Sequence, residues 1–272
     1  MDRYAVIGHP INHSKSPFIH TLFARQTQQH MCYEAIELAK DGFIAGVSEL
    51  FANGLRGCNV TVPFKQQAYQ FAHQLTDRAR VAHAVNTLKM TDDGLILGDN
   101  TDGAGLLTAL DLEFGSLADR CILLLGAGGA ARGVIGPLLA ANPRSLVIAN
   151  RTHDKAQALA EQFSTLGGIE AMSLTNLDGR FDLIINATSA SLAGQRLSLP
   201  ARVIHPQVCC YDMMYQVGMT EFNQWAKQLG ARQTIDGLGM LVSQAAESFA
   251  IWRGIRPGVR QVISEMRRNM NV

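Results

Sequence analysis

A run of five apolar residues followed by a glycine-rich turn, Cys121–Arg132, constrains the fold of this chain more than any other feature. The apolar run is typical of a strand that is buried on both faces. Gly126, Gly128 and Ala131 then occupy the small-residue positions of the pattern G-x-G-x-x-G/A, where a tight turn, a close approach to a pyrophosphate and close helix packing are needed. Because such a turn can also be only a turn, the surrounding residues must decide whether it binds a nucleotide.

The composition indicates a globular protein and sets limits on its partners. The 272 residues are 47% hydrophobic and 17% charged, which argues against disorder. A net charge of +1 provides no excess of positive charge for binding nucleic acid or an anionic membrane. No apolar run approaches the roughly 20 residues of a membrane helix. We expect a small-molecule substrate, and a monomer or a homodimer.

The cysteines and the N-terminus bear on location. Five cysteines, an odd number without C-x-x-C spacing, predict reduced thiols in a cytoplasmic protein. A strand is expected almost from Met1, which leaves no room for a signal peptide.

Alternating strand and helix patterns predict an α/β fold with two domains. We expect an N-terminal α/β domain over residues 1–101 and a Rossmann-like, doubly wound parallel-sheet domain over 102–236, which carries the glycine turn. The helical residues 237–272 are expected to pack back on the first domain. The strands expected in the first domain are Tyr4–Gly8, Met31–Ile36, 57–62, and a hairpin of Thr87–Met90 with Leu95–Leu97; its helices are 17–28, Phe43–Phe51, Lys65–Phe71 and Asp77–Ala82.

Two polar clusters in the first domain have both a structural and a functional interpretation. Ser16 before Pro17 is typical of a helix N-cap, yet the hydroxyls of Ser14 and Ser16 also suit a carboxylate ligand. Asn59 and Thr61 are expected on one face of a strand that Pro63 stops.

Lys65 and Asp102 are two separate charged candidates. A lysine is usually a solvated surface charge, but Lys65 follows an apolar strand at an edge that favours ligands. Asp102 could cap the helix that follows it. Gln244 lies among apolar residues of a predicted buried helix, where an amide needs partners, so it is a candidate ligand contact.

The second strand of the Rossmann-like domain ends in Asn150-Arg151-Thr152, with Lys155 close behind. An NAD site carries an acidic residue about here to bind the ribose 2′-hydroxyl. Two cations in place of that acidic residue favour a 2′-phosphate and hence NADP. The carboxylate of the nearby Asp154 weakens this preference for NADP over NAD.

The assembled motifs resemble those of shikimate dehydrogenases, and they occur in the same order from Tyr4 to about Pro257. The motifs are Ser14-Lys15-Ser16-Pro17, Asn59-Val60-Thr61-Val62-Pro63-Phe64-Lys65, Ala84-Val85-Asn86-Thr87, Gly98-Asp99-Asn100-Thr101-Asp102-Gly103, Gly126–Ala131, Asn150-Arg151-Thr152, Asn186-Ala187-Thr188-Ser189, and the run from Asp236 to Ala245. The resemblance implies an NADP-dependent oxidoreductase that interconverts 3-dehydroshikimate and shikimate in aromatic amino-acid biosynthesis.

The resemblance also implies a role for each matched residue. Lys65 would transfer the proton, with Asp102 as its partner. The implied substrate contacts are Ser14, Ser16 and Tyr215 at the carboxylate, and Thr61, Lys65, Asn86, Asp102 and Gln244 around the hydroxyls. The implied cofactor contacts are Asp77, Gly126, Ala127, Gly128, Gly129, Ala130, Asn150, Arg151, Thr152, Lys155, Met213 and Gly237; no metal is implied.

Two other functions remain open at this point. A quinate/shikimate dehydrogenase with broader cofactor use would share these motifs. A non-catalytic NADP-sensing module would share the fold, although it would have no need for a proton donor such as Lys65.

Overall fold

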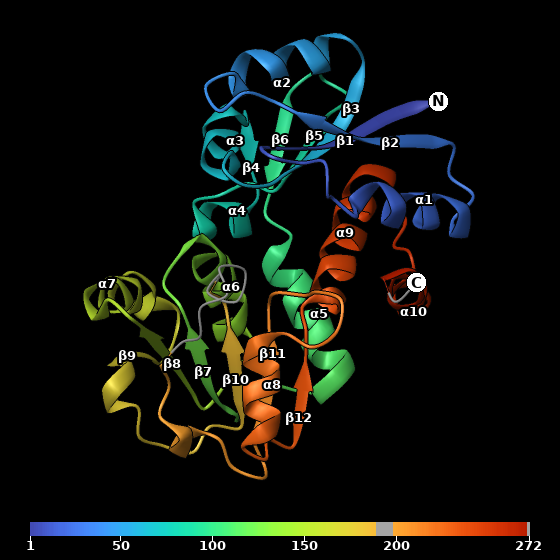
Figure 1. Ribbon diagram of the computed structural model, residues 1–272. Helices are drawn as coiled ribbons and strands as arrows, with labels where there is room; N and C mark the ends of the chain where they lie inside the picture. The colour runs from blue at the N-terminus through green and yellow to red at the C-terminus, as the bar shows by residue number, and fades with distance from the viewer. Residues whose placement is uncertain (189–197, 271–272) are drawn as a thin grey trace. The chain divides into compact units, whose positions relative to one another are not determined.

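The computed structural model describes residues 1–188 and 198–270, which divide into two compact units (Figure 1). The first unit comprises Met1–Gly105 and Val242–Asn269, and the second comprises Leu106–Leu241 and Met270. Both boundaries fall inside helices, α5 (Asp102–Phe114) and α9 (Leu238–Arg253). The predicted α/β fold is confirmed, with residues 242–269 in the same unit as the N-terminal segment.

The first unit is built on a mixed six-stranded sheet in the order β2-β1-β3-β5-β6-β4. Its strands are β1 (Asp2–Gly8), β2 (Met31–Glu37), β3 (Leu55–Val60), β4 (Gln74–Leu75), β5 (Thr87–Met90) and β6 (Ile96–Asp99). β1 pairs in parallel with β2 and β3, whereas β5 runs antiparallel to β3 and β6. The predicted β5–β6 hairpin is therefore confirmed, and the two-residue β4 was not expected.

The helices of the first unit follow the predicted pattern closely. They are α1 (Ser16–Gln26), α2 (Phe43–Ala52), α3 (Lys65–Phe71), α4 (Asp77–Ala82) and α10 (Val259–Met270). The predicted N-cap at Ser16 is wrong, because Ser16 is already helical and Lys15 occupies the cap position without a side-chain cap bond. Pro17 still lies in the first turn, where a missing N–H costs nothing.

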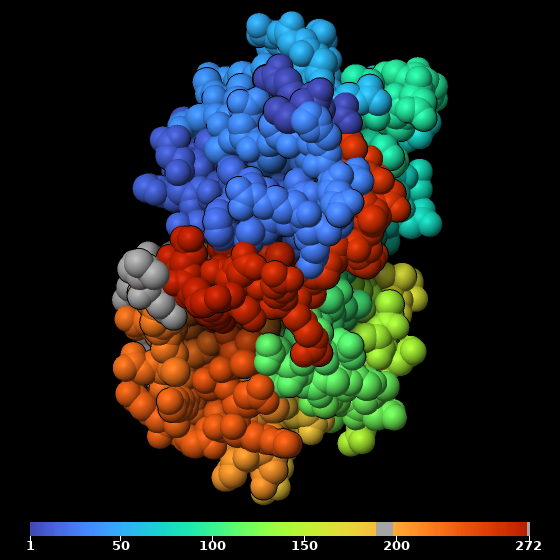
Figure 2. All heavy atoms as spheres, turned by 90° about the vertical axis from the view of Figure 1, so that its right-hand side faces the viewer, coloured from blue at the N-terminus to red at the C-terminus, as the bar shows by residue number. Residues whose placement is uncertain are grey.

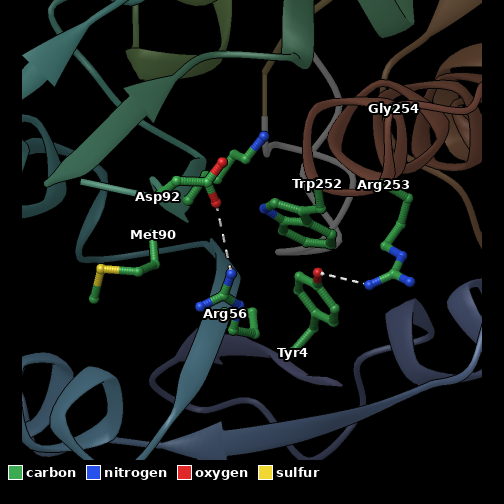
Figure 3. Close-up of a pocket in the computed structure, with 8 residues that line it drawn as sticks. Tyr4, Arg56, Met90, Asp92, Trp252, Arg253 and Gly254 are labelled. Atoms are coloured by element: carbon green, nitrogen blue, oxygen red, sulfur yellow. Dashed lines mark hydrogen bonds and ion pairs between the residues drawn. The ribbon is translucent and has the colours of Figure 1, made fainter. Parts of the chain in front are cut away.

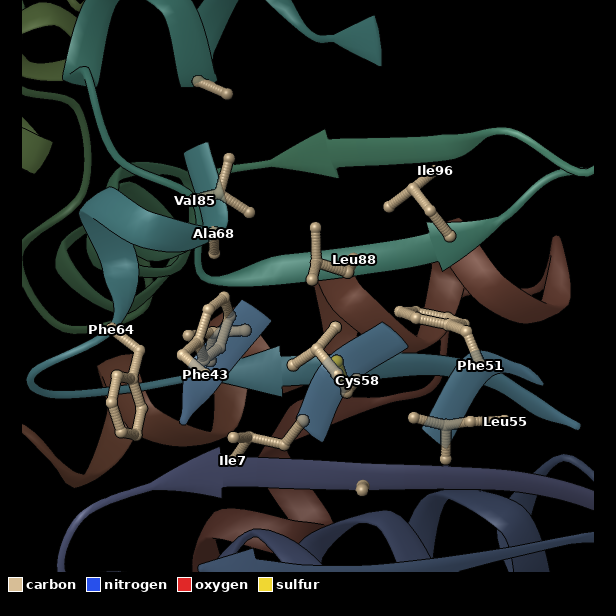
Figure 4. Close-up of a cluster of buried hydrophobic side chains, with 14 residues drawn as sticks. Ile7, Phe43, Phe51, Leu55, Cys58, Phe64, Ala68, Val85, Leu88 and Ile96 are labelled. Atoms are coloured by element: carbon tan, nitrogen blue, oxygen red, sulfur yellow. The ribbon is translucent and has the colours of Figure 1, made fainter. Parts of the chain in front are cut away.

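One face of this sheet carries the hydrophobic core that Figure 4 shows. Phe43 and Phe51 of α2 pack with Ile7, Cys58 and Leu88 from three neighbouring strands, and all five are at most 7% exposed. Alternate residues of each strand supply this face, as the two-residue period of a strand requires. Full burial of each large side chain stabilises the unit by about 1.5–3 kcal/mol.

The C-terminal segment of the first unit packs against its N-terminal residues. Trp252 of α9 stacks on Tyr4 of β1 with ring centroids 4.8 Å apart. The Gln26 side chain accepts from Gly258 N at 2.8 Å and donates to Gly258 O at 3.3 Å, just before α10. Figure 2 shows the red side chains of this segment lying directly against the blue N-terminal ones.

The second unit is built on a six-stranded sheet in which every pair is parallel. Its strands are β7 (Cys121–Leu125), β8 (Ser145–Asn150), β9 (Ile169–Ser173), β10 (Leu183–Asn186), β11 (Cys209–Asp212) and β12 (Gln233–Ile235). Read from β9 to β12 the spatial order is 3-2-1-4-5-6, the order of doubly wound dinucleotide-binding folds. Ile122–Leu125 are fully buried, as the apolar run predicted.

Among the described residues, three α-helices belong wholly to this unit: α6 (Gly129–Ala140), α7 (His153–Phe163) and α8 (Glu221–Gln228). Short 3-10 turns occur at Ser164–Leu166, Leu174–Asn176 and Ala201–Val203. α7 and β9 were not expected from the sequence.

The cysteines of this protein occur as free thiols. All five cysteines are free, three of them buried and two half-buried. Burial raises the pKa of Cys210 to about 12, which keeps that thiol protonated and inert. None of the helices in the described part of the chain is long and apolar enough to cross a membrane.

Candidate active site

Lys65 and Asp102 meet in the first unit, with Nζ 2.5 Å from Oδ2. Lys65 is the first residue of α3 and Asp102 the first residue of α5, so both side chains project from helix starts. The lysine side chain is 31% exposed and the aspartate side chain 17%. Since an ammonium group has three N–H bonds, this ion pair leaves two for another acceptor.

Asn86 fixes the orientation of the Asp102 carboxylate. Its Nδ2 donates to Asp102 Oδ1 at 2.8 Å, while the other carboxylate oxygen binds Lys65. Its own Oδ1 accepts from Thr101 N at 2.9 Å, which holds the amide in one orientation. At 3% exposure, this amide is part of the protein interior and preorganises the charged pair.

Gln244 of α9 joins the same group of side chains. Its Oε1 lies 3.4 Å from both Asn86 Nδ2 and Thr101 Oγ1. The structure therefore brings together four of the sequence-predicted residues, Lys65, Asn86, Asp102 and Gln244, from three helices and the segment before β5. The helix-cap interpretation of Asp102 is wrong, because its carboxylate oxygens are bonded to Lys65 and Asn86.

Close packing of α5 on α9 holds Asp102 and Gln244 together. A Cβ added at Gly105 would lie 2.6 Å from Gln244 N and 2.8 Å from Gln244 Cα, which are backbone atoms that cannot rotate away. We expect Gly105→Ala to raise the KM for the substrate several-fold and to lower the free energy of unfolding by about 1–3 kcal/mol, because overpacking outweighs the higher helix propensity of alanine. Thermal unfolding and steady-state kinetics measure both effects.

The matched control is Gly42→Ala, where the nearest atom to the new Cβ would be at an ordinary 3.5 Å. If both alanine variants behaved alike, close packing at Gly105 would not support the site.

Ser14, Ser16 and Thr61 lie on loops and a helix start of the same unit. Ser14 Oγ accepts from Ser16 N at 3.3 Å. Thr61 follows β3 rather than lying in it, so the prediction that it shares a strand face with Asn59 is wrong; its N–H donates to Ile7 O at 2.9 Å. In the described ranges no direct hydrogen bond links these three hydroxyls to Lys65 or Asp102.

The glycine turn of the second unit has the geometry that a pyrophosphate needs. Gly126 has a φ of +109°, a conformation that glycine adopts without strain, and it ends β7 at the switch point of the sheet. Gly128 is the N-cap of α6, and Cβ atoms added at Gly128 or Gly129 would meet open space. Ala127 is half-buried and Ala130 exposed, so the first turn of α6 presents its N–H groups to solvent.

The residues predicted to read the 2′-phosphate follow the neighbouring strand β8. Asn150 Nδ2 donates to Thr152 O at 2.9 Å, which shapes the turn into α7. Arg151 and Lys155 are exposed, and within the described residues neither forms an ion pair with Asp154. Both cations therefore remain available to an anion, and the residues present fit NADP.

Other predicted residues of the second unit lie after β10 and β11. Gly237 N donates to Met214 O at 3.0 Å, and a Cβ at Gly237 would overlap the Met213 carbonyl, so only glycine fits there. Burial raises the pKa of Tyr215, which belongs to this unit and not to that of the other predicted substrate residues. Asn186 and Asp212 are the last residues of the adjacent strands β10 and β11, and Asn186 Nδ2 donates to Asp212 Oδ1 at 3.1 Å. The polar residues at these two strand ends therefore meet at one edge of the sheet.

Two predicted positions stand apart from these groups. Asp77 is in the first unit, is 97% exposed, and pairs with Arg80 at 2.7 Å. Ser189, the last residue of the Asn186 motif, lies outside the described residues.

Sequence reasoning did not identify a buried ionic network beside the site. Arg78 donates to both oxygens of Asp99, at 2.6 and 2.7 Å, and lies 3.6 Å from Glu247, which also pairs with Arg256. Hydrogen bonding to Asp99 raises the pKa of Arg78. Asp99 lies three residues before Asp102, so its place in a polar run was the only signal in the sequence.

A further pocket lies in the first unit, around Tyr4, Trp252 and Arg56 (Figure 3). Its volume is about 310 Å³. Lys89 donates to Ile251 O at 2.7 Å, Arg253 pairs with Asp2, and Arg56 lies 4.0 Å from Asp92, so each of its three cations already has a partner in the protein. No group of three or more His, Cys, Asp or Glu able to hold a metal occurs in the described segments.

The second unit is a doubly wound sheet with a glycine turn at its switch point, and the first unit carries a lysine–carboxylate pair. Together these two features define a nucleotide-dependent dehydrogenase. Three family models match: the shikimate dehydrogenase substrate binding domain at residues 6–88, shikimate / quinate 5-dehydrogenase at 109–196, and the shikimate 5'-dehydrogenase C-terminal domain at 237–267. The chain belongs to the shikimate dehydrogenase family, as its motifs predicted.

Individual relatives agree over almost the whole length. The NADP(+) shikimate dehydrogenase of Aeromonas hydrophila is 58% identical over 270 residues, with 99% of each chain covered. An Ael1 enzyme from Pseudomonas putida superposes with a TM-score of 0.93 at 46% identity, covering 97% of this chain and 98% of that one. The shikimate 5-dehydrogenase of Thermus thermophilus, solved with NADP(H) and shikimate, has a TM-score of 0.89 at 32% identity and covers 99% and 100%.

Proposed function

We propose that this protein is an NADP-dependent shikimate dehydrogenase that reduces 3-dehydroshikimate to shikimate, and catalyses the reverse oxidation, in the biosynthesis of aromatic amino acids through chorismate. The observation that carries the proposal is the Lys65–Asp102 pair at 2.5 Å. A protein that only sensed NADP would need no such proton donor beside a ring of substrate-type hydrogen-bonding groups.

NADPH supplies the hydride for the ketone carbon when it is bound. Lys65 then gives a proton from Nζ to the developing alkoxide oxygen, which a general acid within hydrogen-bond reach does best. Asp102 holds the ammonium in place, and Asn86 holds Asp102.

The remaining predicted residues take the following proposed roles. The first unit acts as the substrate domain and the second as the NADP domain. Ser14 and Ser16 bind the substrate carboxylate, while Thr61, Asn86 and Gln244 bind its hydroxyls. The residues proposed for the cofactor are Gly126, Ala127, Gly128, Gly129 and Ala130 for the pyrophosphate, Asn150, Arg151, Thr152 and Lys155 for the 2′-phosphate, and Met213 and Gly237 for the nicotinamide, with Tyr215 and Asp77 as further predicted substrate and cofactor contacts.

The test compares shikimate and quinate as substrates for oxidation, each with NADP and with NAD. We expect turnover with shikimate and NADP to exceed the other three combinations clearly. Comparable rates with quinate would favour a quinate/shikimate dehydrogenase. Tight NADPH binding without any turnover would favour a sensing role.

Arg151 is proposed to select NADP over NAD through its contact with the 2′-phosphate. We expect Arg151→Ala to raise the KM for NADP about tenfold, the scale of one lost charge-assisted hydrogen bond, and to leave the KM for NAD nearly unchanged. Arg144→Ala is the control, since Arg144 is exposed just before the opposite end of β8. Equal losses for both cofactors would contradict this role.

We also propose a cytoplasmic location, which the five free thiols support. The protein acts as a monomer or a homodimer in this proposal, and light scattering of the purified chain decides between the two.

A further inference from the structure

A row of buried and half-buried polar side chains crosses the sheet of the first unit on the face opposite its aliphatic core. Tyr4 is the register partner of Tyr33 in β2, Val6 is the partner of Asn59 in β3, and Asn59 is the partner of Thr87 in β5. Because residues two apart along a strand share a face, Tyr33, Asn59 and Thr87 all point to the same side. Tyr4 stacks on Trp252 there, so α9 covers this face.

Tyr33 determines how the Asn59 amide is oriented. The Tyr33 hydroxyl donates to Asn59 Oδ1 at 2.7 Å. With its oxygen held, the amide must direct Nδ2 toward β5 and α9, where it lies 3.2 Å from Asn86 O, 3.1 Å from Thr87 Oγ1 and 2.8 Å from Ser248 Oγ. Burial raises the pKa of Tyr33, so the phenol remains a donor at every physiological pH.

The Asn59 amide connects this phenol to the candidate site. Asn86, whose carbonyl accepts from Asn59 Nδ2, belongs to the proposed hydroxyl-binding group. A chain of hydrogen bonds thus runs from Tyr33 through Asn59 to Asn86, and from the Asn86 side chain to Asp102.

The ring of Tyr33 is held in place by His20. The two rings are stacked, with centroids 4.1 Å apart and planes 10° from parallel. His20 is fully buried on α1, and burial lowers its pKa to about 3, so it packs as a neutral ring. A neutral imidazole ring stacked in this way restricts rotation of the phenol without adding charge.

We propose that Tyr33 is a positioning residue for the reaction, whose hydroxyl holds the Asn59 amide that bonds to Asn86 and so keeps Asn86 and the Asp102 carboxylate in place. The role rests on the proposed function. Tyr33 itself need not touch the substrate.

The first experiment is Tyr33→Phe, which removes one oxygen and keeps the ring. We expect the KM for shikimate to rise about tenfold and kcat to fall several-fold, because Asn59 Oδ1 loses its donor and the amide can turn. The KM for NADP should change by less than about twofold. Tyr69→Phe is the control, because in the described residues the Tyr69 ring packs near His83 and its hydroxyl has no hydrogen bond.

The second experiment is a double-mutant cycle with Asn59→Ala. Its expected result would not arise if Tyr33 only stabilised the fold. If Tyr33 acts through Asn59, then adding Tyr33→Phe to Asn59→Ala should change kcat/KM for shikimate by less than about twofold. Fully additive losses would overturn the role, and so would a Tyr33→Phe protein that raises both KM values alike and lowers the melting temperature in proportion.

The outcomes separate this role from the proposed function. A wild-type protein without shikimate-dependent turnover would overturn the proposed function and the role of Tyr33 with it. An active wild type with an unimpaired Tyr33→Phe variant would overturn the role of Tyr33 alone.

Discussion

Replacing Lys65 by alanine should lower kcat about 10²–10⁴-fold, the range that a general acid contributes, and change the KM for shikimate much less. The reason is that the proton for the developing alkoxide comes from Nζ, which Asp102 holds at 2.5 Å. Steady-state kinetics in both directions measure the effect. Lys65→Arg should stay nearly as slow, because a guanidinium keeps the charge but does not release its proton.

The two variants together separate proton transfer from substrate binding. Recovery of activity in Lys65→Arg would show that the charge alone matters, so Lys65 would be mainly a substrate clamp. A large rise in KM at unchanged kcat in Lys65→Ala would give the same conclusion. Lys40→Ala, at an exposed position before α2, serves as the unaffected control.

Asp99→Ala should lower the free energy of unfolding by about 3–5 kcal/mol, the largest stability effect that we expect in the first unit. The side chain of Asp99 is only 4% exposed, and its carboxylate accepts from Arg78, from Thr76 Oγ1 at 2.7 Å and from Asn100 N at 2.7 Å. Removing it leaves the Arg78 guanidinium without its main partner in a poorly hydrated site. Urea unfolding of the purified protein measures the change.

The control for this variant is Asp92→Ala. Asp92 is fully solvated and lies 4.0 Å from Arg56, a separation at which an exposed ion pair contributes little. Its unfolding midpoint should equal that of the wild type. If Asp99→Ala also unfolded at the wild-type midpoint, the network of Arg78, Asp99 and Glu247 would not stabilise this unit.

Local sequence signals predicted most of the regular structure. The expected bounds of α3 and α4, Lys65–Phe71 and Asp77–Ala82, are those that the structure shows. The signals failed where an element depends on distant partners. β4 has two residues and exists only through pairing with β6, and β9 is an edge strand with partly exposed residues.

In the candidate site, too, local signals identified single residues better than contacts between distant ones. The Lys65, Asn86 and Asp102 motifs were visible because each is a polar run at the end of an apolar element. The resemblance also implied that Asp102 is the partner of Lys65, and the two charged groups lie 2.5 Å apart. The bonds that Asn86 makes to Asp102 and Thr101 were not visible, since they depend on how β5 and α5 are placed in three dimensions. Tyr33 was missed for the same reason, because only the register of β1 with β2 and β3 brings its phenol onto Asn59.

The most direct test of the account is the rate at which the purified protein consumes NADPH in the presence of 3-dehydroshikimate, with the product identified chromatographically. The account predicts rapid, stoichiometric formation of shikimate that is strongly slower with NADH and nearly lost in Lys65→Ala. NADPH that binds but is not consumed, or a Lys65→Ala protein that forms shikimate at the wild-type rate, would contradict it.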